Sequence, residues 1–315
     1  MVETPVLFET FVRVDYARQV WNAIKKAQPK ILYFYSNKGR AEKEGEVECN
    51  NEIRSWINEI DWECELHTWF REECVDVYTS LRGAVDWICE HEEQWIVLED
   101  DVVPTPAFFS FCDQMIEKFK DEKNVWYISG DNFYNLNPSG YDYIFSRYHW
   151  MYGWATWRDR WKKIKWGDFG MEKLLNESIC YKLYKTNNQA IKRERQICDI
   201  KDMVLKTNCW DYAFGLTVDS NLGFGVFPIR HLIHNIGISG QHHDNPVITF
   251  VNIEPSYPSD IYTVKKDYPV CECDMDYDYL YIKNHKKNTY LGRIVYFLKH
   301  PQNLFCRIIF KLIHK

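Results

Sequence analysis

Three acidic residues in a row, Glu99, Asp100 and Asp101, follow directly on the apolar run Trp95–Leu98. The run is short, continuous and apolar, which predicts a buried strand. Open α/β sheets place their ligands just beyond the carboxyl ends of such strands. Carboxylates there are the hard oxygen ligands that Mg²⁺ or Mn²⁺ prefers, and the alternative interpretation is a solvated acidic turn. The triplet after a buried strand favours the divalent-metal site.

The elements that would position these acids alternate between strand and helix over the first 130 residues. Strand-like runs cover 5–11, 31–35, 64–69, 94–98 and 125–130, and helical periodicity covers 16–27, 48–60, 80–90 and 106–119. A repeated strand–helix–strand order requires parallel pairing. The sequence therefore predicts an α/β fold with a mostly parallel central sheet flanked by helices.

Beyond Tyr141 this alternation stops, and aromatic-rich loops such as 152–157 are expected. A polar helical stretch is expected at 171–207, a helix at 210–220 and a strand at 225–228. Asp211 would lie at the start of that helix, where an acid also favours the helix dipole.

Composition narrows the class of protein. The net charge of −6 disfavours a general nucleic-acid binder. The aromatic share of 17% suits stacking on sugar rings as well as core packing. The N-terminus lacks signal-peptide features, no apolar run is long enough to span a membrane, and the 11 cysteines are scattered. We therefore expect a cytoplasmic protein with free thiols, and no structural zinc at Cys271 and Cys273.

The segment Ile96–Pro104, followed by Phe108 and Phe109, resembles the core motif of the haemolysin-like bacterial nucleotide-diphospho-sugar transferases. These GT-A glycosyltransferases are distantly similar to the Golgi N-acetylglucosaminyltransferase that starts complex N-glycans. Further segments resemble the family in the same order, at 6–13, 29–33, 70–73, 127–130, 145–147, 153–157, 210–212 and 235–237. The family usually has Asn-Leu-Gly where this chain has Cys74–Asp76, which leaves the role of that loop open.

The resemblance implies a GT-A type fold with the nucleotide-sugar site at the strand carboxyl ends. It also implies a metal-dependent, inverting transfer from a UDP-sugar or another nucleotide sugar to a saccharide in surface glycan synthesis. Asp211 would be the catalytic base, and Asp101 would hold Mn²⁺ or Mg²⁺, with His243 (or His242) as a second ligand. The donor would contact Thr10, Phe11, Arg13, Ser36, Lys38, Arg71, Glu99 and Asp100, and the acceptor side would include Gly153 and Trp154.

The sequence divides into a GT-A domain at 1–245, a surface-wrapping segment at 246–280 and a basic amphipathic tail at 281–315. Eight basic residues and no acidic one lie between Lys283 and Lys315. The basic composition of residues 293–315 therefore predicts contact with an anionic membrane surface on the cytoplasmic side, where a lipid-linked saccharide acceptor would be found. Docking of the tail on its own core is the alternative.

Two other functions fit parts of the pattern. A nucleotidyltransferase also uses carboxylates and Mg²⁺ on an α/β sheet, but it would need a glycine-rich, basic first loop, and Glu9–Arg13 contains no glycine. A non-catalytic protein that binds sugar or membrane on a transferase fold would predict binding without turnover.

Overall fold

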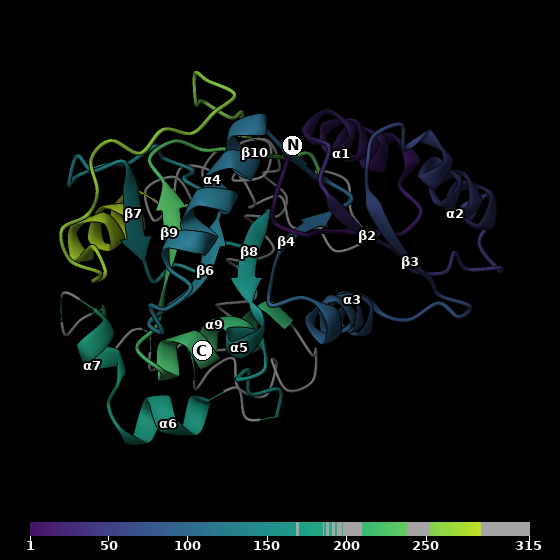
Figure 1. Ribbon diagram of the computed structural model, residues 1–315. Coiled ribbons are helices and arrows are strands. Elements are labelled where there is room, and N and C mark those ends of the chain that lie inside the picture. Colours follow the sequence, from purple (N-terminus) through teal and green to yellow (C-terminus); the bar gives the residue numbers. More distant parts are fainter. Residues whose placement is uncertain are drawn as a thin grey trace, which may run out of the picture.

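The computed structural model describes residues 1–167, 170–184, 186, 189–190, 193, 197, 210–237 and 253–284. Its centre is an eight-stranded sheet in the order β3-β2-β1-β4-β8-β6-β9-β7 (Figure 1). The strands are β1 (Val6–Thr10), β2 (Ile31–Ser36), β3 (Glu65–Phe70), β4 (Gln94–Glu99), β6 (Val125–Ser129), β7 (Tyr143–Ser146), β8 (Trp154–Trp157) and β9 (Phe224–Pro228).

Six of these strands run in the same direction. β1 pairs in parallel with β2 and β4, β2 with β3, and β6 with β9. β8 is antiparallel to both β4 and β6, and β7 is antiparallel to β9. The predicted mostly parallel α/β sheet is confirmed. The carboxyl ends of β1, β2, β3, β4, β6 and β9 share one edge, called the carboxyl edge below.

The expectation of loops at 152–157 is wrong, because β8 is a fully buried strand in the middle of the sheet. A four-residue strand buried on both faces has no alternation of apolar and polar residues. Hydrophobic periodicity therefore does not reveal this strand, and the aromatic residues around it favour a loop interpretation.

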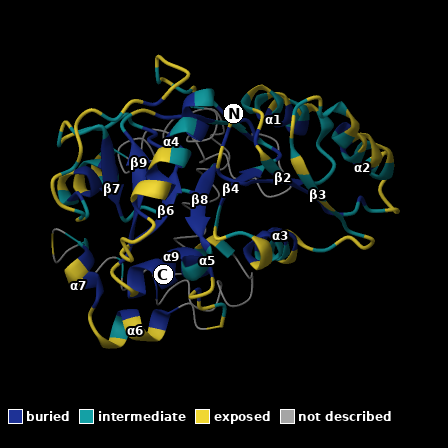
Figure 2. Cartoon of the chain, viewed as in Figure 1, coloured by how far each residue is buried: buried dark blue, intermediate teal, exposed yellow. Residues whose placement is uncertain are grey.

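Helices cover both faces of the sheet, and the strands at its centre are buried (Figures 1 and 2). Successive side chains of a strand point to opposite faces. Val6 and Phe8 of β1 pack with one group that includes α1 and α4, whereas Leu7 packs with the group that includes α3 and α9. Both faces of β1 are therefore buried, which explains its continuous apolar sequence. The helices are α1 (Val14–Ala27), α2 (Glu46–Ser55), η1 (Trp56–Glu59), α3 (Val77–His91), α4 (Pro106–Lys118), α5 (Arg158–Trp161), α6 (Met171–Asn176), α7 (Cys180–Leu183) and α9 (Trp210–Ser220).

The helix starts follow the sequence closely. Asp76 caps α3 by accepting hydrogen bonds from the backbone N–H groups of Tyr78 and Thr79. Thr105 caps α4, which begins with Pro106 in its first turn.

A second, two-stranded sheet closes over the acidic triplet. β5 (Val102–Pro104) pairs antiparallel with β10 (Ile233–Asn235). The backbone N–H of Ile236 donates to the carbonyl of Asp101 at 2.9 Å. The chain after β10 therefore lies directly against the acids.

Residues 253–284 pack along the sheet and end in a helical segment at 275–284. The Tyr262 hydroxyl donates to the carbonyl of Asp142 at 2.6 Å and accepts from the N–H of Ile229 at 2.9 Å. The domain boundary predicted at 280 falls inside this helical segment, and the predicted membrane-contacting residues 293–315 lie outside the described residues. Among the described helices, none combines the length and apolar character needed to cross a bilayer.

Candidate functional site

Four carboxylates meet where β1 and β4 end at the carboxyl edge. Glu9 of β1 lies opposite Glu99 of β4 in the parallel register. Asp100 and Asp101 follow in the turn after β4. The Ser80 hydroxyl of α3 donates to Glu9 Oε1 at 2.8 Å, so Glu9 points toward the α3 side of the sheet. Two paired strands and one turn thus concentrate negative charge in a buried region.

Burial and mutual repulsion make these carboxylates costly to ionise. Burial raises the pKa of Glu9 to about 8, with further contributions from Asp100 and Asp101 that the Ser80 hydrogen bond partly offsets. Burial also raises the pKa of Glu99 well above its ordinary value, and the charge of Asp101 adds to the effect. The pKa of Asp100 rises to about 6, again mainly through burial. The site would be stabilised by additional positive charge.

Arg13 supplies the positive charge that the structure contains. Its guanidinium pairs with Asp100, and its Nη1 lies 2.8 Å from Asp101 Oδ2. Burial lowers the pKa of Arg13, but the two aspartates outweigh burial and raise it overall. The second carboxylate oxygen of Asp100, Oδ2, is buried with no hydrogen-bond partner among the described residues. One guanidinium therefore leaves part of the cluster's acceptor capacity unused.

The acids fit a divalent cation by the chemistry of their donor atoms. All are hard oxygen ligands, and the buried Asp100 Oδ2 still needs a partner. Gly237 leaves space beside Asp101, because a Cβ there would lie 2.1 Å from Asp101 Oδ2. No ready-made group of three or more ligating side chains occurs within the described part of the chain. His242 and His243 lie outside it.

The predicted nucleotide-binding residues gather at the carboxyl ends of β1, β2 and β3. Thr10 pairs with Ser36, and Ser36 pairs with Phe70, the neighbour of Arg71. Thr10 Oγ1 donates to the carbonyl of Tyr35 at 3.0 Å. Thr10 and Ser36 are both buried, so they support the surface residues at this part of the carboxyl edge and do not reach solvent themselves. Four predicted residues are only partly buried and reach the surface here: Phe11, Arg13, Lys38 and Arg71.

Two polar side chains that the sequence analysis did not single out hold this region together. Asn50 Nδ2 donates to the carbonyl of Phe11 at 2.8 Å and to Ser36 Oγ at 3.0 Å. Arg54 Nε donates to Ser36 Oγ at 3.1 Å, and its Nη2 donates to the carbonyl of Arg71 at 2.9 Å. Both come from α2, whose low amphipathicity gave no hint that it faces a polar site.

Gly153 and Trp154 lie inside the protein. Trp154 is fully buried and stacks on Trp210 and Trp161, with ring centroids 5.7 and 6.0 Å apart. Gly153 has φ +67°, and a Cβ there would lie 2.5 Å from Ile233 Cδ1. Neither residue offers a free face to a sugar. Trp154 instead fixes the position of Trp210, and thereby of Asp211, relative to β4.

Asp211 begins α9 and lines a cavity of about 910 Å³. The residue is exposed to this space, yet the surrounding protein displaces enough water to raise its pKa, an effect that backbone hydrogen bonds partly offset. Burial raises the pKa of Tyr152, and the charges of Glu99, Asp101 and Asp211 all add to the rise. One side chain thus lies within electrostatic reach of both the triplet and Asp211.

Glu9 is the residue of this site that sequence reasoning missed. Its position at the end of the first strand is visible in the sequence, but its partner is not. Only the strand order, which makes β1 the parallel neighbour of β4, places Glu9 opposite Glu99. Tyr152 was also missed, because it lies in a stretch expected to be loop. It is half-buried, and the charges of Asp101 and Asp211 both act on it.

No protein-family model and no curated protein matches the chain. Solved structures similar to it include the mannosyltransferase PcManGT from Pyrobaculum calidifontis in complex with GDP-Man and Mn²⁺, at 15% identity and TM-score 0.35. That match covers 50% of this chain and 45% of the mannosyltransferase, so the chain spans less than half of that protein's length. A UDP-glucose pyrophosphorylase complexed with UDP-glucose matches at 9% identity and TM-score 0.34, over 72% of this chain and 90% of that one.

The glycosyltransferase GlyE from Streptococcus pneumoniae TIGR4 matches at 10% identity and TM-score 0.28, over 80% of this chain and 57% of GlyE. Similarities at these TM-scores do not by themselves assign an activity. The haemolysin-like family stays a prediction, and any functional inference has to rest on this chain's own residues.

Proposed function

We propose that this protein is a metal-dependent, inverting glycosyltransferase that moves a sugar from a UDP-sugar, or another nucleotide-diphosphate sugar, to a saccharide acceptor. The observation that carries the proposal is the arrangement of two acidic sites, the four-carboxylate cluster and Asp211, which are connected through the pairing of β4 with β8. The four-carboxylate cluster ends β1 and β4, and Trp154 of β8 stacks on Trp210, the neighbour of Asp211. In this proposal, the stack of Trp154 on Trp210 would hold the base near the donor site.

Asp101 and Asp100 are the residues that would hold a divalent cation, and His243 would be the predicted further ligand. A bound Mn²⁺ or Mg²⁺ would neutralise the charge that develops on the diphosphate leaving group. Glu99 and Glu9 would lie beside the donor, where their carboxyl oxygens can bind its sugar or ribose hydroxyls.

Arg13 has a second role in this proposal. Its guanidinium is the cation that the described structure places on Asp100 and Asp101. Guanidinium groups also bind phosphate oxygens in a bidentate manner. When the donor binds, Arg13 would therefore leave its ion pairs with Asp100 and Asp101 and pair with the donor's diphosphate. Donor binding would in this way free the two carboxylates.

Asp211 would act as the base. Its carboxylate would take the proton of the acceptor hydroxyl while that oxygen forms a bond to C1 of the donor sugar. The bond between C1 and the diphosphate oxygen breaks at the same time, and the nucleoside diphosphate leaves with that electron pair. The raised pKa of Asp211 makes it a stronger base than an ordinary aspartate.

A surface polysaccharide as product, a cytoplasmic location and contact of residues 293–315 with an anionic membrane complete the proposal. They rest on the resemblance and on the composition of the tail. Binding of sugar without turnover, as in a non-catalytic protein, is the competing outcome that the following experiment addresses.

The test is release of nucleotide from UDP-, GDP- and CMP-sugars by the full chain with Mn²⁺ and a mixture of saccharide acceptors. We expect release from one donor class, and we expect Asp211→Asn to lower the rate by about 100-fold or more. The wild-type rate should fall as pH falls through the raised pKa of Asp211, because a base must be unprotonated. Asp159→Asn is the control, because Asp159 lies in α5, at the sheet edge opposite the carboxyl edge. Full activity of Asp211→Asn would exclude the proposed base.

A further inference from the structure

The cavity that contains Asp211 lies beside α9. Its walls come from the segment 147–150, from α9 and from the helical segment 275–284, with Tyr184 and Arg193 adding to them. These segments are far apart in the sequence. None of the predicted donor-binding residues lines it.

Aromatic rings form much of the cavity wall. Tyr148 and Trp150 are half-buried here, and Tyr148 stacks on Tyr281 with ring centroids 4.9 Å apart. Tyr184 and Tyr212 contribute two more half-buried rings. Flat rings with hydroxyl or indole N–H groups present an apolar face and a polar edge, as sugar rings do.

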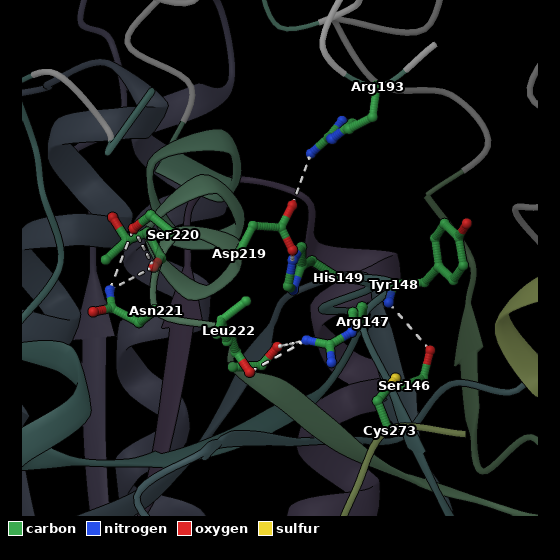
Figure 3. Close-up of polar contacts among 12 residues, drawn as sticks. Ser146, Arg147, Tyr148, His149, Arg193, Asp219, Ser220, Asn221, Leu222 and Cys273 are labelled. Carbon is green, nitrogen blue, oxygen red and sulfur yellow. Dashed lines mark hydrogen bonds and ion pairs between the residues drawn. The ribbon is translucent and has the colours of Figure 1, made fainter. Parts of the chain in front are cut away.

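A buried charge network lines the cavity eight residues further along α9 than Asp211, which is about 12 Å along a helix. Figure 3 shows this network. Asp219 of α9 bonds to His149 Nε2 at 3.1 Å and to Arg193 Nη2 at 3.3 Å. Burial raises the pKa of Asp219, but His149 and Arg193 outweigh burial and lower it overall. Asp219 is therefore ionised and already balanced by two partners.

Arg147 adds a positive charge that acts, against the effect of burial, to lower the pKa values of Asp219 and Asp278, without forming an ion pair with either. Its Nη1 donates to the backbone carbonyls of Leu222 and Gly223, each at 3.2 Å (Figure 3). Among the described residues no carboxylate lies within ion-pair distance of its guanidinium. Lys283 also lines the cavity. Among the described lining residues, three cations (Arg147, Arg193 and Lys283) thus accompany two aspartates, in a chain of net charge −6.

Three consecutive residues of the wall carry polar atoms without partners. Arg147 Nε, the Tyr148 hydroxyl and His149 Nδ1 are all buried, and none has a hydrogen-bond partner within the described part of the chain. Leaving such a group unpaired costs about 1–3 kcal/mol. Three unpaired groups in adjacent wall residues indicate a surface that is completed by a polar ligand.

We propose that this cavity binds the acceptor, and that the acceptor is a saccharide carrying an anionic group, which Arg147 recognises. The inference rests on the proposed function, because Asp211 as base requires the acceptor hydroxyl to lie beside it. The anionic group is either a carboxylate of an acidic sugar or a phosphate. Tyr148 and Trp150 would pack against the sugar ring.

The experiment titrates the full-length protein with D-glucose, D-glucuronate and D-glucose 6-phosphate, which differ only at C6, and follows binding by saturation-transfer difference NMR. We expect one charged probe to bind at least about fivefold more tightly than glucose, because a guanidinium–anion hydrogen bond is charge-assisted. Tighter glucuronate identifies a sugar carboxylate, and tighter glucose 6-phosphate identifies a phosphate. Equal binding of all three probes would overturn the proposal.

Arg147→Gln should reduce the favoured probe to the affinity of glucose, whereas Arg158→Gln, at the opposite edge of the sheet, should leave all three affinities unchanged. Unchanged preference in Arg147→Gln would contradict the assignment, and so would displacement of the probe by UDP with Mn²⁺, which would place the probe in the donor site. UDP binding itself uses none of these residues. If UDP binds while the probes show no preference, only the acceptor inference fails.

Tyr148→Phe covers the case in which Arg147→Gln does not fold. The change removes a hydroxyl that has no partner among the described residues and keeps the ring that stacks on Tyr281. Thermal stability should therefore hold or rise, while affinity for the probes falls by about threefold or more. Unchanged affinity would show that the probes do not reach this wall.

Discussion

At the scale of single residues, the pairing of Glu9 with Glu99 shows how a functional position can oppose stability. Two carboxylates lie opposite each other on adjacent parallel strands, and one of them has a pKa of about 8 because it is buried. A group whose pKa is higher in the folded state binds more protons there than in the unfolded state. The folded protein therefore tolerates Glu9 best when it is protonated.

This has a measurable consequence for stability. In EDTA, the free energy of unfolding should fall as pH rises from 4.5, the ordinary pKa, to about 8, the folded-state pKa. Glu9→Gln keeps an acceptor for the Ser80 hydroxyl and removes the ionisation. The variant should lose much of this decline and be more stable than wild type above pH 8, by on the order of a few kcal/mol.

Glu52→Gln, an exposed change on α2, is the matched control and should follow the wild-type curve. Denaturant unfolding at several pH values measures the difference. A Glu9→Gln curve parallel to that of the wild type would mean that Glu9 is ionised in the folded state.

Residue types alone predicted the acidic triplet and its place at a strand end, because a run of buried apolar residues followed by acids has few other interpretations. They did not predict Glu9, Tyr152 or the network of His149 and Asp219. Glu9 and Ser80 are 71 positions apart in the sequence, and His149 and Asp219 are 70 positions apart. Such pairs are set by strand order and by how loops return, which no local pattern encodes.

At the scale of elements, β10 controls the space around the metal-binding acids. The chain after β10 passes Asp101 so closely that a Cβ at Gly237 would lie 2.1 Å from Asp101 Oδ2. A side chain there must move either the carboxylate or the β5–β10 sheet, and overpacking of this kind costs about 1–3 kcal/mol. Gly237 is therefore required by close approach of the backbone to the acids.

Gly237→Ala should lower the free energy of unfolding by about 1–3 kcal/mol and weaken nucleotide binding. Gly167→Ala is the control, because a Cβ at Gly167 meets nothing within 4 Å. Thermal unfolding and nucleotide titration of both variants test the prediction. Equal behaviour of the two variants would show that Asp101 has room to move and that β10 does not fix it.

β1 to β4, β6 and β9 were predictable at this scale, and β7 and β8 were not. β1 to β4 are separated by helices, so apolar runs and helical periodicity mark each of them. β7 and β8 have four residues each and are fully buried. These two strands run opposite to the other six. Their placement depends on tertiary packing instead of on a local signal.

At the scale of the whole molecule, one sheet joins two different chemical environments. The carboxyl edge of β1 and β4 gathers four carboxylates beside the Arg13 guanidinium, and we propose a metal ion and a diphosphate there. The cavity along α9 gathers aromatic rings and cations, which suits an anionic saccharide. Trp154, stacked on Trp210 and paired with Val97, connects the two environments through the sheet itself.

The central claim is that the acids of the carboxyl edge bind a nucleotide through a divalent metal. Isothermal titration of UDP, GDP and CMP, with and without Mn²⁺, against the wild type and Asp101→Asn tests it most directly. We predict that one nucleotide, UDP in the first instance, binds only when Mn²⁺ is present, and that Asp101→Asn weakens this binding at least about tenfold. Absence of nucleotide binding under every condition, or equal binding by wild type and Asp101→Asn, would contradict the account and make the acidic cluster a structural feature.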